Sequence, residues 1–252
     1  MSHHIRVITP IVSDLFSEAQ LQPYATDSIR LTHTRIDKGP ASIESTFDEA
    51  LAQPDTLVKV LEAEEEGCDA IVINCLGDPA LNPAREIVNI PVVGPYQASM
   101  HLANMLGDNF AVISVLDNVR LLLEHLAAKY SLSERYVGFD YVNISVLDLE
   151  ADLDGLVKAM TEKSVMLIEG QQANSIILGC TGMLGCAQGI RTQLLDRGLD
   201  VPVIDPLVAA IQMAEAMVSS DLSHSHHAYQ TPPEKDIVGY SFPDRKENKK
   251  TA

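Results

Sequence analysis

Apolar and polar positions alternate between two kinds of segment along the chain. Short runs rich in Val and Ile, bounded by Gly, Pro or Asp, are typical of strands buried on both faces of a sheet. These runs occupy 5–12, 29–36, 70–75, 90–94, 110–115, 136–144, 175–180 and 201–205. Longer segments with apolar residues at i, i+3, i+4 and i+7 predict helices between them. The predicted helices cover 46–66, 95–106, 117–129, 152–172, 184–197 and 207–219.

This alternation predicts an α/β fold with mostly parallel sheets that helices cover on both sides. One helix carries a proline in its interior. Pro54 lies within 46–66, and since proline removes a helical hydrogen bond and clashes with the preceding turn, we expect a break or a two-segment helix there.

The pattern also repeats within the chain. The segment "CDAIVINCLGDPA", followed by a helix and then by "IPVVGPYQASMHLANML", corresponds to "ANSIILGCTGMLG", a helix and "VPVIDPLVAAIQMAEAM". An internal duplication predicts two pseudo-symmetric Rossmann-like lobes, although a single doubly wound sheet produces similar echoes by chance. We expect a discontinuous first lobe, a second lobe and a C-terminal extension. Their predicted bounds are 1–96 plus 206–222, 97–205 and 223–252, respectively.

Composition and charge exclude several classes of partner. Eighteen Lys and Arg against 35 Asp and Glu give a formal charge of −17, which repels nucleic acids and anionic membrane surfaces. The longest apolar runs are far shorter than the roughly 20 residues that span a bilayer. The N-terminus lacks the pattern of a signal peptide. We therefore expect a cytoplasmic protein with reduced cysteines.

Histidines gather in the C-terminal extension. His224, His226 and His227 lie close together, but no Cys or carboxylate stands at a matching ligand spacing. We interpret this stretch as a solvated loop and predict no metal site.

Two of the four cysteines occupy equivalent positions in the repeat. Cys75 ends the strand 70–75 and Cys180 ends the strand 175–180, each just before a turn. Ligands of open α/β sheets bind at this carboxyl edge, where free N–H groups can lower the pKa of a thiol. Two thiols facing one carbon suit stereoinversion, in which one removes a proton and the other donates one to the opposite face. The alternative is hydrophobic packing, which we expect for Cys68 and Cys186.

Four segments resemble hydantoin and allantoin racemases, within the aspartate/glutamate racemase superfamily. They read "GPASIESTFDEA" (39–50), "NCLGDP" (74–79), "PVVGPYQAS" (91–99) and "GCTGM" (179–183). The resemblance extends to about residue 219. It implies two pseudo-symmetric α/β lobes, an active site in the cleft between them, and neither pyridoxal phosphate nor any other cofactor or metal. It also implies that Cys75 and Cys180 exchange the α-proton of the substrate.

The neighbours of the two cysteines are expected to shape the site. Asn74 either binds substrate or secures the end of its strand. Gly77 allows a tight turn, and Asp78 is either a helix cap or a polar wall of the site. Thr181 and Gly182 are expected to bring a hydroxyl and N–H groups to an enolate oxygen of the substrate.

Two loops depart from the family pattern. Hydantoin racemases usually carry an Asn-Pro-Asn-Thr type turn after the first strand, whereas this chain reads "ITPIVSD" at 8–14. Thr9 and Ser13 retain hydroxyls there, and we expect them to bind substrate. The second loop, "SVLDN", begins at Ser114, a third expected substrate contact. Glu44, in "SIES", is interpreted as a residue of a solvated loop or a cap. These departures leave the substrate open.

The sequence thus predicts a cofactor-independent racemase or epimerase that inverts a carbon acid next to a carbonyl. A hydantoin, allantoin or related amino-acid derivative is the expected small-molecule substrate, and a homo-oligomer is left open. We expect the turn to lower the pKa of one cysteine while the other stays protonated. The alternatives are an enzyme like maleate isomerase or malonate decarboxylase, or a non-catalytic protein that binds a small metabolite.

Overall fold

The computed structural model describes residues 2–243 and contains two parallel sheets of four strands each. The first contains β1 (His3–Thr9), β2 (Ile29–Arg35), β3 (Ala70–Ile73) and β4 (Val92–Val93). The second contains β5 (Phe110–Ser114), β6 (Tyr136–Tyr141), β7 (Ile176–Leu178) and β8 (Val203–Ile204). The strand orders are β2-β1-β3-β4 and β6-β5-β7-β8, so each sheet follows the same order. The predicted α/β class and the two pseudo-symmetric parallel sheets are confirmed.

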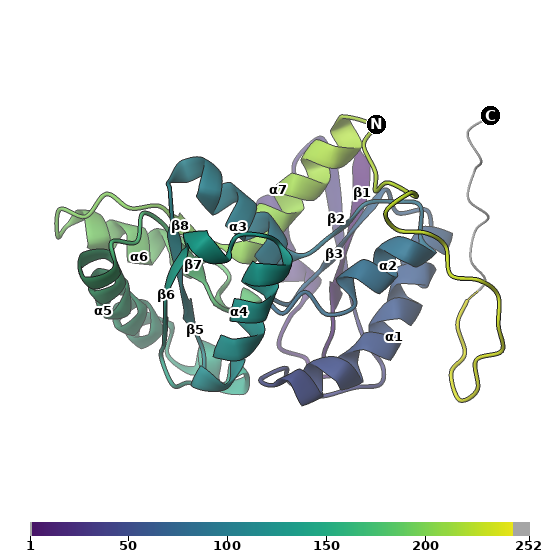
Figure 1. Ribbon diagram of the computed structural model, residues 1–252, viewed down its shortest axis with the longest axis horizontal. Coiled ribbons are helices and arrows are strands. Elements are labelled where there is room, and N and C mark those ends of the chain that lie inside the picture. Colours follow the sequence, from purple (N-terminus) through teal and green to yellow (C-terminus); the bar gives the residue numbers. More distant parts are fainter. Residues whose placement is uncertain (1, 244–252) are drawn as a thin grey trace.

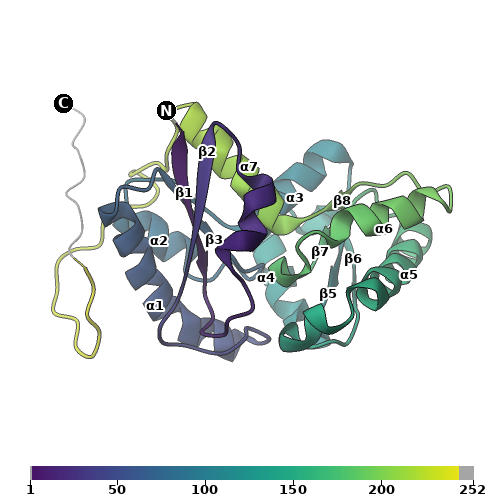
Figure 2. The ribbon, with the colours of Figure 1, turned by 180° about the vertical axis from the view of Figure 1, so that it is seen from behind.

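Helices cover both faces of each sheet (Figures 1 and 2). The α-helices are α1 (Thr46–Glu65), α2 (Leu81–Ile87), α3 (Pro95–Leu106), α4 (Arg120–Lys129), α5 (Leu153–Gln171), α6 (Cys186–Leu195) and α7 (Pro206–Ser219). Helices α1 and α2 pack on one face of the first sheet and α7 on the other. Helices α3 and α4 cover one face of the second sheet, and α5 and α6 the other. The double cover explains why β3, β5 and β7 consist entirely of buried residues.

The predicted break at Pro54 is wrong, because α1 runs without interruption from Thr46 to Glu65. The carbonyl that Pro54 leaves without its helical donor belongs to Ala50, an exposed residue, so water can satisfy it. Ser45 accepts a hydrogen bond from the Asp48 N–H and fixes the start of the helix.

Helix α7 returns to the first sheet after the second is complete. It packs against β1, β3 and β4, and it lies beside α3 at the junction of the two halves (Figure 1). Leu207 and Ile211 of α7 join the core that Val7 and Val72 form. The exact lobe bounds stay a prediction.

The segment after α7 runs back over the first half (Figure 2). The Ser223 hydroxyl donates to the carbonyl oxygen of Asn89, and the Nε2 of His224 lies 2.8 Å from the Val92 nitrogen. Arg85 donates to the hydroxyl of Tyr229 at 3.1 Å. The predicted extension is thus partly docked; its last residues, 244–252, lie outside the described part of the chain.

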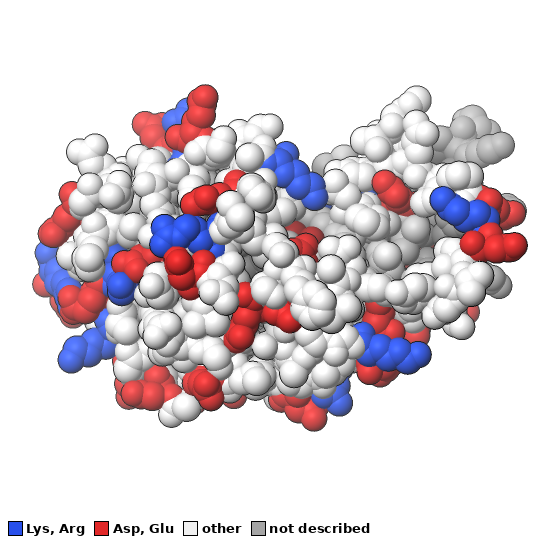
Figure 3. Space-filling model, turned by 60° about the horizontal axis from the view of Figure 1, so that its bottom comes forward, with Lys and Arg blue, Asp and Glu red and all other residues white. Residues whose placement is uncertain are grey.

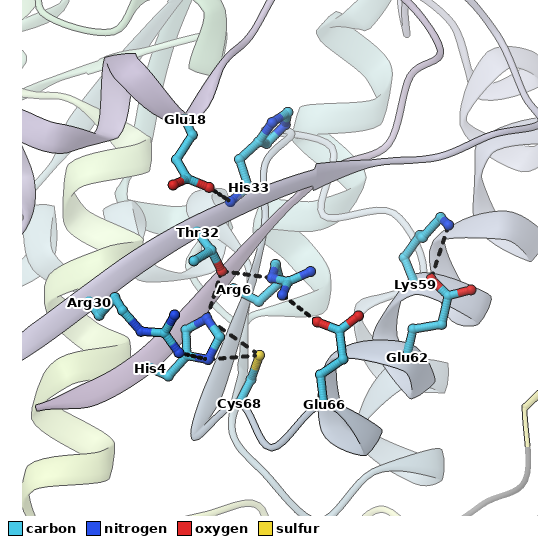
Figure 4. A network of polar contacts seen from close by, with 10 residues as sticks. All are labelled: His4, Arg6, Glu18, Arg30, Thr32, His33, Lys59, Glu62, Glu66 and Cys68. Carbon is cyan, nitrogen blue, oxygen red and sulfur yellow. Dashed lines mark hydrogen bonds and ion pairs between the residues drawn. The ribbon is translucent and has the colours of Figure 1, made fainter.

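Cys68 and Cys186 are both buried, as the packing interpretation requires. Cys68 lies at the amino ends of the strands, where its sulfur is 3.5 Å from Nδ1 of His4 in a polar network (Figure 4). Ligands of open α/β sheets bind at the opposite edge, which the carboxyl ends of the strands form.

In the described residues, none of the helices is both long enough and apolar enough to cross a bilayer. On the face shown in Figure 3, Lys and Arg form separate spots among more extensive Asp and Glu. This face offers no continuous basic surface to a nucleic acid.

Candidate active site

A single cavity between the two halves receives both cysteines of the repeat. Asn74, Cys75 and Gly77 line it from the loop after β3, and Cys180 and Gly182 line it from the loop after β7. Its empty volume is about 850 Å³, which includes space open to solvent. The two copies of the cysteine motif therefore line the same cavity, at the carboxyl edges of both sheets.

Each sulfur is close to an N–H group two residues further along the chain. The N–H of Gly182 donates to the Sγ of Cys180, with an N to S distance of 3.4 Å. The N–H of Gly77 makes the corresponding hydrogen bond to Cys75. A donated hydrogen bond favours the thiolate over the thiol, so the shared Cys-x-Gly sequence gives each half the same local support for negative charge.

Burial outweighs that support. Desolvation raises the pKa of Cys180 to about 11, with a smaller contribution from the negative charge of Glu44. Desolvation also raises the pKa of Cys75, further than that of Cys180, and the charge of Cys180 adds to the effect. The expectation that a turn lowers the pKa of one cysteine is therefore wrong, because the apolar surroundings cost the charged form more than one N–H returns.

Apolar side chains form most of the cavity wall. Ile11 and Phe16 line it from the segment after β1, and Leu122 of α4 and Leu149 line it from the second half. Glu150 is the one residue with a charged side chain among the described residues of this lining. The cavity therefore fits an uncharged molecule with apolar surface.

Thr9 and Asn74 take part in one hydrogen-bonded group at the cavity. The Nδ2 of Asn74 donates to the Oγ1 of Thr9 at 3.1 Å, and that oxygen lies 2.9 Å from the Nε2 of His33. Thr9 and Asn74 both line the cavity, as a substrate-binding role would require.

Thr181 and Gly182, expected to donate to a substrate oxygen, make hydrogen bonds within the protein. The Thr181 hydroxyl donates to the backbone carbonyl oxygen of Asn74 at 3.3 Å, which joins the two cysteine loops. The Gly182 N–H faces the Cys180 sulfur and not open space in the cavity. A role for either group as donor to an enolate oxygen would require these bonds to be exchanged.

Three expected substrate contacts lie outside the cavity lining. The Ser13 hydroxyl donates to the Ala41 carbonyl oxygen, and the Ser114 hydroxyl is fully buried and donates to the Gly179 carbonyl oxygen. Asp78 is a helix cap, but of α3 and not of the helix that directly follows it. Its carboxylate accepts the N–H groups of Tyr96 and Gln97, at 3.0 and 2.9 Å.

Loop contacts join the two halves near the cavity. Glu44 accepts the Val146 N–H at 2.7 Å, and Gln20 donates to Glu150 at 3.2 Å. The sequence predicted a solvated loop or a capping role for Glu44 and no role for Phe16, Val146 or Leu149. The segments that carry these four residues lack a regular hydrophobic period. Only the polar composition of "SIES" drew attention to Glu44.

The chain matches known racemases over most of its length. The family model "Asp/Glu/Hydantoin racemase" matches residues 17–214. A hydantoin racemase of Pseudomonas sp. strain NS671 is 38% identical over 80% of this chain and 79% of the relative. A hydantoin racemase of Paenarthrobacter aurescens is 35% identical over 93% of this chain and 99% of the relative.

A solved structure agrees with these sequences. An allantoin racemase from Klebsiella pneumoniae has a TM-score of 0.87 and is 32% identical, covering 94% of this chain and 97% of its own. The match thus spans both sheets and the loops that hold the two cysteines. The chain belongs to the Asp/Glu/hydantoin racemase family and is a racemase of the hydantoin and allantoin type.

Proposed function

We propose that the protein racemises a cyclic ureide, a hydantoin with an apolar substituent at C5, by proton transfer between Cys75 and Cys180. The observation that carries this proposal is the shared cavity, in which equivalent loops of the two halves present one thiol each. The hydantoin and allantoin racemases to which the chain is similar support the substrate class.

The charges of the lining favour a ureide over a free amino acid. An α-carboxylate normally needs an Arg or Lys partner when water is excluded. Among the described residues of the lining there is no such cation, and Glu150 adds a negative charge. In a hydantoin ring the corresponding carbonyl is part of an uncharged imide, so it enters the cavity without an unpaired charge.

The apolar wall favours a hydrocarbon substituent over the ureido group of allantoin. Each methylene group transferred from water to apolar surroundings contributes about 0.8 kcal/mol. Phe16, Leu122 and Leu149 offer such surroundings. A ureido group would instead bring buried donors and acceptors to a wall that has few partners for them.

The reaction follows from two thiols on opposite sides of one carbon. One sulfur, as thiolate, removes the C5 proton, and the bonding electrons pass into the adjacent carbonyl as an enolate. The thiol of the second cysteine then delivers its own proton to the opposite face of C5. The product has inverted configuration, and the thiol and thiolate have exchanged places.

Repulsion between the two sulfurs limits ionisation to one of them. A thiolate on Cys180 raises the pKa of Cys75, so a second ionisation is disfavoured. One thiolate opposite one thiol is the protonation state that this chemistry needs. A nucleophilic role like that of a maleate isomerase would leave a covalent adduct on Cys75, detectable by mass spectrometry, whereas proton transfer leaves none. A decarboxylase like those of malonates would need only one of the thiols.

The test is a panel of optically pure compounds followed by the decay of optical rotation. We expect fastest racemisation of hydantoins with benzyl or isobutyl substituents, slower racemisation of allantoin, and none of aspartate or glutamate. Racemisation of free amino acids alone would contradict the proposal. Thermal stabilisation by a hydantoin without racemisation would instead favour a binding protein. The cytoplasmic location and a homo-oligomeric state stay predictions.

A further inference from the structure

The carboxyl ends of β1, β2 and β3 carry three polar side chains on one face of the first sheet. Side chains alternate between faces along a strand, and Thr9, His33 and Asn74 share the parity of Val7, Leu31 and Val72, which face α7. The register pairs Val7 with His33 and Ile8 with Ile73, so the three side chains converge. Their hydrogen bonds run from Asn74 through Thr9 to His33.

One atom of this group has no partner. The Oδ1 of Asn74 is buried and makes no hydrogen bond, although Asn74 is only 5% exposed and lines the cavity beside Cys75. A buried acceptor without a donor is costly, and native structures hold few of them. A ligand N–H in the cavity is the partner that would complete the group.

The Thr9 hydroxyl has a single proton, so its direction orders the whole group. If Thr9 donates to the Nε2 of His33, its oxygen lone pairs receive the Asn74 amide N–H, and the amide oxygen is left for a ligand. If His33 carries its proton on Nε2, it donates to Thr9. The Thr9 proton is then no longer held by His33, and when it turns toward Asn74 the amide flips to present a donor. Only the tautomer with an unprotonated Nε2 engages the Thr9 proton, so that Thr9 acts as an acceptor toward Asn74 and the amide oxygen stays open to a ligand.

The surroundings of His33 favour the neutral ring. Burial is the main reason that its pKa is lowered, and the positive charges of Arg35 and Arg6 lower it further, against the opposing charge of Glu18. The Glu18 carboxylate accepts the His33 backbone N–H at 3.2 Å and lies apart from its ring (Figure 4). The rings of His33 and Phe16 make a T-shaped contact with a centroid distance of 5.1 Å. Neutral His33 can therefore accept the Thr9 proton at Nε2.

We propose that His33 is a positioning residue which, through Thr9, holds the amide oxygen of Asn74 as the acceptor for a ring N–H of the substrate. This inference rests on the proposed function, because cyclic ureides carry N–H groups next to the reacting carbon. It assigns His33 a part in substrate recognition without direct contact to the reacting atoms.

The tautomer is measured first, independently of activity. Nitrogen NMR shifts of the ¹⁵N-labelled protein at neutral pH distinguish the two ring nitrogens of each histidine, and His33→Gln identifies the His33 signals by their loss. We expect the proton on Nδ1. A proton on Nε2 would overturn the proposal, and this result does not depend on whether any hydantoin is turned over.

Kinetics then separate recognition from folding. We expect His33→Phe, which keeps the aromatic contact, to raise KM for a 5-benzylhydantoin by roughly fivefold, the scale of one hydrogen bond, with kcat changed less than twofold. His33→Gln supplies another acceptor and should retain most of the affinity. Asn74→Leu should raise KM by at least as much as His33→Phe. Adding His33→Phe to Asn74→Leu should change KM no further.

His101→Phe, at an exposed position on α3, is the matched control and should behave as wild type. Ring-methylated analogues supply the last comparison. Wild type should discriminate against methylation of one ring nitrogen, and Asn74→Leu should not. If His33→Phe lowers kcat and leaves KM unchanged, or if His33→Gln behaves like His33→Phe, the proposal is overturned. If wild type racemises no hydantoin, the proposed function fails while the tautomer result stands.

Discussion

The surroundings of Cys180 hold its thiol in the protonated form, and a rise in pH is the perturbation that measures this effect. Desolvation places the pKa at about 11, compared with about 8.5 for an unperturbed cysteine. At pH 8 only about one molecule in a thousand would then carry the thiolate, against about one in four for an unperturbed thiol. Each further pH unit should raise that fraction about tenfold until the pKa is approached.

Alkylation by iodoacetamide reports the thiolate directly, because the thiolate is the nucleophile. Peptide mass spectrometry resolves Cys180 from the other three cysteines, so no substitution is needed. We expect the logarithm of the Cys180 rate to rise with a slope near one between pH 7 and pH 10, without a plateau. A plateau below pH 9 would refute the reasoning, since it would mean that the N–H of Gly182 outweighs desolvation.

Other consequences are open to simple measurements. Glu44→Gln keeps an acceptor for its backbone partner but removes the charge that raises the pKa of Cys180, so alkylation at pH 8 should accelerate about twofold to fivefold; an unchanged rate would exclude that charge effect. Gly94→Ala should lower the free energy of unfolding in urea by about 2 kcal/mol, because its Cβ would lie 2.5 Å from the pinned carboxylate of Asp78. Gly170→Ala, in the open on α5, is its control and should raise the same quantity by about 0.5 to 1 kcal/mol; equal losses in both variants would contradict the packing argument.

Periodicity was sufficient to locate most of the regular structure, because these segments are amphipathic or buried throughout. The strand 110–115 was predicted and Phe110–Ser114 is observed; the helix 95–106 was predicted and Pro95–Leu106 is observed. Helix α2, with only seven residues, is too short to establish a period, and only the repeat indicated a helix between the strands 70–75 and 90–94. The predicted break at Pro54 was wrong because the outcome depends on whether water can reach the carbonyl of Ala50, which the sequence does not reveal.

The two cysteines were found because the same motif occurs twice at the ends of buried strands. A repeated motif does not predict which loops, distant in sequence, contact one another. Asp78 was expected either to cap a helix or to form a polar wall of the site. The chain turns there with a φ of 48°, and the carboxylate caps α3 and not the helix that follows it in sequence. Phe16 and Leu149 reach the cavity lining from segments without a regular hydrophobic period, so their place near the two thiols could not be predicted either.

The central claim is that two thiols exchange one proton on opposite faces of the substrate. Racemisation and α-proton exchange in deuterated water, followed from each pure enantiomer of 5-benzylhydantoin, test it most directly with Cys75→Ser and Cys180→Ser. We predict that wild type forms the opposite enantiomer with deuterium at C5, and that each variant loses racemisation from both enantiomers while exchange persists at most from one. Racemisation by Cys75→Ser or Cys180→Ser at the wild-type rate would contradict the account.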